Sequence, residues 1–243
     1  MNGEIKLIVE FLKKILNKKL IHSVHTEEIS KEEIFTQYIN IINSKSDSQK
    51  AVLAKNLITI IVEYLNYYEL IQTIEGNNKS LKNCQIEQIY GILGNKMHLN
   101  PTIHVVKNNK DIDINDIPIL IDPWNKDRVI NNILFFIDEN NIFDWKNSNG
   151  NIQNYYIKPM NIIICRGGNH SQFAAKIQKQ GITTITEIRD FSNIYEEVHF
   201  NGENYIDNNG EIIRIEYNKD TIFFYSGLIF ELGRYLLEFK YII

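Results

Sequence analysis

Cysteine is scarce in this sequence: its 243 residues include only Cys84 and Cys165. The two lie far apart and form no metal-type spacing, so the sequence indicates neither a disulfide framework nor a zinc site. A reduced cytoplasmic protein is the simplest interpretation. No run approaches the roughly 20 uncharged apolar residues that span a bilayer. Charges at Glu4, Lys6 and Glu10 interrupt the start of the chain, so we expect neither a membrane helix nor a signal peptide.

Positive charge is not in excess either. The formal net charge is −4, which gives no support to strong non-specific binding to nucleic acid or to a membrane surface. The pairs Lys13-Lys14 and Lys18-Lys19 could contact nucleic acid, although a solvated helix face is the ordinary interpretation. Nucleic acid therefore stays open as a partner, and a membrane is not expected. With 44% hydrophobic residues, the chain can build a substantial core.

The first hundred residues predict helices. Near the start, apolar residues recur at three- and four-residue steps, as on one face of an amphipathic helix: Ile5, Ile8, Leu12, Ile15 and Leu16. Ser30 with Glu33 has the signature of a capping box at the start of a second helix. A longer apolar pattern runs from about residue 48 to Gly76, and a weaker one covers about 81 to 93. We predict a helical bundle over residues 1–100.

The pattern changes at Pro101. The runs TIHVVK and IPILID are short and β-branched, as strands are, and so is TTITEI at 183–188. YYIKPMNIIIC predicts two strands, or one strand broken at Pro159, and the Asn-Gly pairs after residue 200 predict a small β-meander. A final apolar helix spans about 221–239; it is a core helix or, alternatively, an oligomer interface. The fold class is thus α+β, with a second domain at 101–243 in which helices flank a mixed sheet.

The stretch ICRGGNHSQFAAKI, residues 164–177, joins a predicted strand directly to a predicted helix. The first amides of such a helix have no intrahelical acceptor and, with the helix dipole, attract anions. Gly167 and Gly168 let a phosphate approach, and hydrogen bonds could come from the side chains of Asn169, His170 and Ser171. A cation could come from Arg166. The alternative is a plain tight turn with an Asn cap, and the residues alone leave both open.

The neighbourhood of this turn resembles the ParB/sulfiredoxin superfamily. Gly168, Asn169 and His170 match the D-G-N-H-R form of its motif, found in the phosphorothioation-linked and ParB-like nuclease branches. Ala174, Ala175, Gly181 and the strand at 183–188 match the pattern that follows the motif. The resemblance covers residues 102–190, and it implies a ParB/sulfiredoxin-like sheet in the second domain.

The resemblance implies a nucleotide as partner, with its phosphates on the backbone of Gly167–Gln172 and with His170 as the catalytic candidate. A nucleoside triphosphate and Mg²⁺ are the implied cofactors, and no metal ligands are identified. Ser171 stands where the superfamily usually has Arg, and Arg166 could compensate. Asn169 stands where sulfiredoxin has its reactive Cys and ParB its Glu, so neither peroxiredoxin reduction nor ordinary CTP hydrolysis is expected. Cys165 is best read as a buried structural residue.

Four further residues are candidates for lining the pocket. In ParB-like chains a Pro-containing segment ending in Arg occupies a similar place before the first helix. This makes Asp122, Trp124 and Arg128 candidates, Trp124 by stacking on a base. The interpretation that we favour places Trp124 in the core and Asp122 in a turn. Glu187 could supply a carboxylate to Mg²⁺, although a surface role is more common.

We therefore predict a bacterial or phage nucleotide-binding protein, with NTP hydrolysis or phosphoryl transfer as its chemistry if it is an enzyme. The resemblance implies a mobile-element or phage-defence context. A metal-dependent nuclease or DNA-modification-associated protein is one alternative. A non-catalytic interaction module with a degenerate pocket is the other. A second copy or another protein could bind through the N-terminal bundle or the C-terminal helix.

Overall fold

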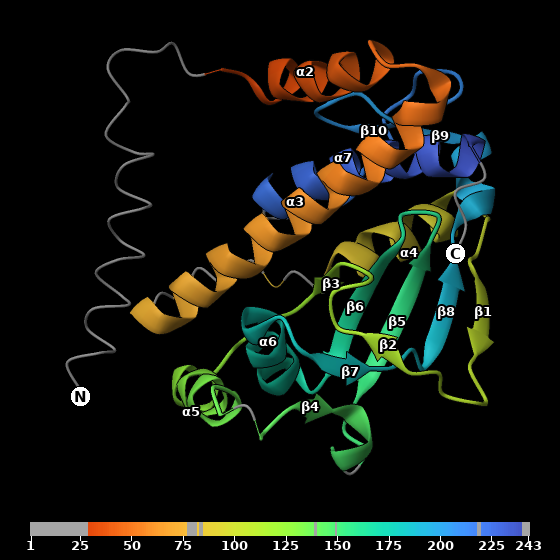
Figure 1. Cartoon of the computed structure of the whole chain (residues 1–243). Helices are drawn as coiled ribbons and strands as arrows, with labels where there is room; N and C mark the ends of the chain where they lie inside the picture. The colour runs from red at the N-terminus through yellow and green to blue at the C-terminus, as the bar shows by residue number, and fades with distance from the viewer. Residues whose placement is uncertain are drawn as a thin grey trace.

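The computed structural model describes residues 29–76, 82, 85–138, 140–148, 150–217 and 220–239. It is a mixed α+β structure (Figure 1). The helices are α2 (Lys31–Asn43), α3 (Asp47–Glu75), α4 (Ile86–Lys96), α5 (Lys126–Phe136), α6 (Asn169–Gln178) and α7 (Asp220–Glu238). The helix predicted near residues 5–16, the basic pairs that follow it and Cys84 lie outside the described residues.

The strands form three sheets. They are β1 (Thr102–Val105), β2 (Ile112–Asp113), β3 (Ile119–Leu120), β4 (Phe143–Asp144), β5 (Gln153–Lys158), β6 (Ile162–Gly167), β7 (Gly181–Thr183), β8 (Glu187–Asp190), β9 (Val198–Phe200) and β10 (Tyr205–Asp207). The largest sheet has the order β1-β8-β5-β6-β3, and β2-β7-β4 and β10-β9 form two smaller ones. β5 and β6 are antiparallel, whereas β6 runs parallel to β3 and β5 parallel to β8, so the main sheet is mixed.

The single strand predicted at 183–188 is wrong. Its two ends belong to different sheets, since β7 stops at Thr183 and β8 starts at Glu187. The residues between them bond to Asn154 of β5 instead of continuing a ladder: the Asn154 side chain donates to Thr184 O over 2.8 Å. The Thr186 N–H donates to Asn154 O over 2.9 Å. The long-range polar contacts of one Asn thus divide a sequence of good β propensity.

The predicted helix ends are confirmed where local chemistry sets them. The Ser30 Oγ accepts the Glu33 N–H, and the Glu33 carboxylate accepts the Ser30 N–H, which completes the capping box of α2. α3 ends at Gly76, whose φ of 72° is left-handed. The same chemistry starts α5: the Asn125 side chain caps this helix by accepting the Arg128 N–H over 2.9 Å.

Apolar side chains fill both faces of the main sheet. Along β6, Ile162 and Ile164 belong to a cluster with α3, α4 and α7, whereas Ile163 and Cys165 belong to a cluster with α5 and α6. This alternation follows from the two-residue period of a strand. The first cluster contains residues from both sides of residue 100, and the division into domains 1–100 and 101–243 stays a prediction.

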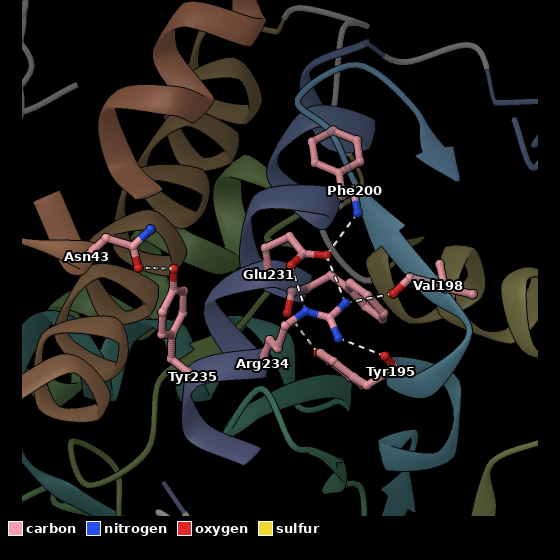
Figure 2. A network of polar contacts seen from close by, with 8 residues as sticks. Asn43, Tyr195, Val198, Phe200, Glu231, Arg234 and Tyr235 are labelled. Carbon is pink, nitrogen blue, oxygen red and sulfur yellow. Dashed lines mark hydrogen bonds and ion pairs between the residues drawn. The ribbon is translucent and has the colours of Figure 1, made fainter. Parts of the chain in front are cut away.

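α7 is a core helix, as the favoured interpretation of its apolar run predicts. Leu228, Ile229 and Phe230 are fully buried in the first cluster. An ion pair anchors the helix to the segment around β9 (Figure 2): Glu231 binds Arg234 and accepts the Phe200 N–H over 2.8 Å. Arg234 in turn donates to the carbonyl oxygens of Tyr195 and Val198, each over 2.7 Å.

A buried Asn of α3 fixes the free edge of the main sheet. The Asn66 amide donates to Ile119 O over 2.7 Å and accepts the Ile121 N–H over 2.9 Å, as a neighbouring strand would do. Because β3 leads directly into Asp122, this contact also sets where the following loop leaves the sheet.

Candidate anion site at the start of helix α6

The glycine pair between β6 and α6 is required by packing. A Cβ on Gly167 would lie 2.3 Å from Asn151 O, and one on Gly168 would lie 2.3 Å from the Ile152 Cδ1. Gly168 is also the N-cap of α6 with a φ of 75°, in the left-handed region that favours glycine. The plain-turn interpretation therefore accounts for both glycines, and the question of an anion depends on the groups around them.

The first amides of α6 lack protein partners in the described part of the chain. Gly168 makes no side-chain cap, and the hydrogen bonds within α6 begin with the Gln172 N–H, which donates to Gly168 O over 3.0 Å. No described residue accepts a hydrogen bond from the N–H groups of Asn169, His170 or Ser171. These groups carry the positive end of the helix dipole.

The side chains of the motif hold a distant loop in place. Asn169 Oδ1 accepts the Asp122 N–H over 3.1 Å, and His170 Nε2 accepts the Asn125 N–H over 3.1 Å. Ser171 Oγ donates to Asn132 Oδ1 of α5 over 3.0 Å. Three consecutive residues of α6 thus fix the loop before α5 and α5 itself against the turn.

This loop brings an aromatic ring and a cation to the turn. The Trp124 ring lies edge-on to the His170 ring at a centroid distance of 5.0 Å, and the Arg128 guanidinium lies 5.3 Å from the Trp124 ring centroid. Trp124 is 63% exposed, so the interpretation of Trp124 as a core residue is wrong. Arg166 is exposed at the end of β6. The structure therefore brings Trp124, Arg128 and His170 together.

His170 is buried and uncharged at neutral pH. Burial lowers the pKa of its imidazole, and the nearby Arg128 cation lowers the pKa further. Because Nε2 accepts the Asn125 N–H, the neutral ring carries its proton on Nδ1. His170 can thus donate one hydrogen bond to a ligand from Nδ1 while Nε2 holds the loop.

We expect the stability of the protein to fall as the pH drops from 7 to 5. A His whose folded pKa lies below its unfolded value takes up its proton more readily in the unfolded chain, so acid favours unfolding below the ordinary pKa of about 6.5. Thermal melts across this range for the wild type and for His170→Gln measure the effect. The slope should be shallower in the variant, and equal slopes would contradict the burial of a neutral imidazole.

Two predicted site residues lie elsewhere. The Gln172 side chain points into the interior, where it bonds to Asn154, Thr183 and Gly167 O. Since its N–H is also bonded within the protein, we leave Gln172 out of the site. Glu187 binds Arg189 through an ion pair and lines, with Trp145 and Tyr155, a cavity of about 400 Å³.

A buried network that the sequence did not predict supports the turn. Asn154 of β5 bonds to the Gln172 amide, to the Thr183 hydroxyl and to Thr184 O, each at 2.8–3.0 Å. A polar Asn beside buried Tyr and Ile positions in a strand is the signal that could have indicated it. Its partners lie 18 to 30 residues away and follow no sequence period.

Comparison with known families gives one result. A family model described as a family of unknown function, DUF6710, matches residues 10–243. The chain belongs to this family. No curated protein and no solved structure matches it. The resemblance to the ParB/sulfiredoxin superfamily thus stays a prediction.

Metal ligands do not gather in the described part of this DUF6710 chain. No group of three or more His, Cys, Asp or Glu side chains there is arranged to hold a metal ion. Within the same residues, no helix combines the length and apolarity needed to cross a membrane.

Proposed function

We propose that this protein binds a nucleotide through its phosphates at the N-terminus of α6. The observation that carries this function is that Trp124, Arg128 and His170 lie beside three helix amides that have no acceptor among the described residues. Asn125 and His170, which hold this arrangement together, lie 45 residues apart in the sequence. The loop and the helix thus bring an aromatic ring, a cation and these backbone donors together in one place.

Each group has a role suited to a nucleotide. The N–H groups of Asn169, His170 and Ser171 suit phosphate oxygens, since they lie at the positive end of the helix. The Nδ1–H of His170 adds a donor, and Arg128 adds a guanidinium that can bind phosphate with two hydrogen bonds. The exposed ring of Trp124 is available to stack on a base.

The resemblance at the motif supports the same function. In the ParB/sulfiredoxin superfamily this turn holds phosphates, and here Gly168, Asn169 and His170 match it. We extend the proposal to the arrangement of the chain, a helical bundle followed by a ParB/sulfiredoxin-like domain. Ser171 bonds to Asn132 instead of supplying the cation of the usual Arg. Arg128 is the cation that we place nearest to the phosphates, with Arg166 as a second.

A saturating nucleotide should raise the melting temperature of the wild type by about 5–10 °C. A ligand at 100 times its Kd adds about 2.7 kcal/mol to the free energy of unfolding. For a chain of this size, each kcal/mol raises the melting temperature by roughly 2–4 °C. Arg128→Ala should weaken binding about 10- to 100-fold, since a charged hydrogen bond contributes about 1.5–3 kcal/mol. Thermal melts with ATP, GTP, CTP and UTP, each with and without Mg²⁺, measure both effects.

Arg214→Ala is the matched control, because Arg214 is an exposed arginine that lies after β10 and outside both α6 and the loop before α5. It should leave the nucleotide shift unchanged. His170→Gln keeps an acceptor for the Asn125 N–H and removes the imidazole donor, so it should weaken binding without unfolding the loop. If no nucleotide shifts the wild type under any of these conditions, the proposed function is wrong.

A further inference from the structure

The long helix α3 exposes a row of apolar side chains. One face of α3 packs on α7 and β3, with Ile58, Ile61 and Leu65 buried in the core. On the other face Ile60, Tyr64 and Tyr67 are 60%, 46% and 45% exposed. α3 runs obliquely along one side of the molecule, past α7 and toward α6 (Figure 1). Three large apolar side chains on adjacent turns form a patch, which is unusual on a free helix surface.

The row continues along the whole helix with the period of a coiled coil. Steps of four and three residues alternate through Leu53, Leu57, Ile60, Tyr64, Tyr67, Ile71 and Ile74. We call these seven residues the α3 seam. Such a repeat is typical of a helix that pairs with another helix along one face. The ends of the seam are partly covered: Leu53, Leu57 and Ile74 pack against the core clusters. Among the described residues, the middle, Ile60–Ile71, is contacted only at its flanks: the Tyr64 ring lies 5.4 Å from the Tyr225 ring of α7, and the Tyr67 ring lies 6.3 Å from the Phe173 ring of α6. Ile60 stays 60% exposed.

The start of the chain carries a row of the same kind. Ile5, Ile8, Leu12 and Ile15 recur at steps of three, four and three, and the charges at Lys6, Glu10, Lys13 and Lys14 lie on the opposite face of a helix. Residues 5–16 and residues 60–71 are both twelve residues long. As helices, both would be about 18 Å long. The two rows therefore agree in period and in length.

The connecting chain is long enough to join them. α2 starts at Lys31, contacts α3 and is joined to it through residues 44–46. Residues 17–30, fourteen residues, can extend over about 46 Å, whereas the α3 seam from Leu53 to Ile74 covers about 32 Å. We infer that residues 5–16 of the same chain cover the middle of the α3 seam as a helix. The N-terminal segment is then a further helix of the bundle, and its docking is independent of nucleotide binding.

The direction in which one substitution changes the melting temperature tests this docking. Alanine favours a helix more than isoleucine does, so Ile60→Ala on a bare surface would leave the melting temperature unchanged or raise it. Under a covering helix the same change removes buried methyl groups, and the full-length protein should melt about 3–8 °C lower. Leu12→Ala should lower it similarly. Val52→Ala and Lys13→Ala are the controls, because Val52 is 48% exposed outside the α3 seam and Lys13 lies on the charged face.

The double variant and the oligomeric state decide which segment covers the seam. If Leu12 packs on the α3 seam, Leu12→Ala with Ile60→Ala should cost less than the two single losses together, whereas additive losses would overturn the inference. Sedimentation should give a monomer with melting independent of protein concentration. A dimer whose stability rises with concentration would assign the α3 seam to a second copy. An unchanged or raised melting temperature for Ile60→Ala would show that nothing covers it.

Discussion

Replacing Glu231 by alanine is expected to lower the melting temperature by about 6–20 °C. Glu231 is 8% exposed, and its carboxylate binds both Arg234, over 2.8 Å and 3.1 Å, and the Phe200 N–H. Its removal leaves a largely buried guanidinium without a counter-charge, a change that costs about 3–5 kcal/mol. For a chain of this size each kcal/mol lowers the melting point by roughly 2–4 °C. Thermal and urea unfolding of the purified variant measure the loss.

Three variants separate the charge from the packing. Glu231→Gln keeps an acceptor for the Phe200 N–H and should lose less stability than Glu231→Ala. The double variant Glu231→Met with Arg234→Met removes both charges, and its loss should be smaller than the sum of the two single losses. Tyr235→Phe, on the next turn of α7, removes one exposed hydrogen bond to Asn43 (Figure 2) and should change the stability by about 1 kcal/mol or less. Additive losses in the double variant would contradict the coupling.

Helix ends and the apolar character of α7 were predictable, because neighbouring residues determine them. The capping box at Ser30, the left-handed Gly76 and the Asn125 cap each depend on residues within a turn of the helix end. The apolar run of α7 likewise indicated burial without any knowledge of its partners. The split of residues 183–188 between two sheets could not be predicted, since it depends on bonds to Asn154, about 30 residues earlier.

The candidate site was predictable in its motif but not in its contacts. The Gly-Gly pair and the three polar residues after it are visible in the sequence, and the structure places them at a helix start as expected. The contacts of Asn169 with Asp122 and of His170 with Asn125 join residues 47 and 45 positions apart. No period connects such residues. The prediction that Trp124 lies in the core failed because it used only the usual burial of tryptophan. The exposure of Trp124 depends on the course of the loop, which the sequence does not show.

Gln172→Leu is expected to lower the free energy of unfolding by about 3–5 kcal/mol. Gln172 is fully buried; its amide donates to Asn154 Oδ1 and Gly167 O over 3.0 Å each, and it accepts from the Thr183 hydroxyl over 2.6 Å. Leucine fills a similar volume but leaves Asn154 Oδ1 without a donor among the described residues, and it removes one of two partners from Gly167 O and from the Thr183 hydroxyl. A buried unpaired group costs about 1–3 kcal/mol, and each further lost hydrogen bond costs about 0.5–1.5 kcal/mol. Chemical denaturation measures the loss. Gln178→Leu makes the same change at the last residue of α6, where the side chain is partly exposed, and should have little effect.

The same substitution links the buried network to the candidate site. Gln172 holds Gly167 O from one side, and the next residue, Gly168, is the N-cap of α6. The network therefore fixes the direction in which the first amides of α6 point. If the proposed function is right, Gln172→Leu should weaken nucleotide binding although Gln172 contacts no ligand. Asn154→Leu combined with Gln172→Leu removes both amides and should recover part of the stability. A double variant that costs as much as the two single losses together would show that the two amides do not act as one unit.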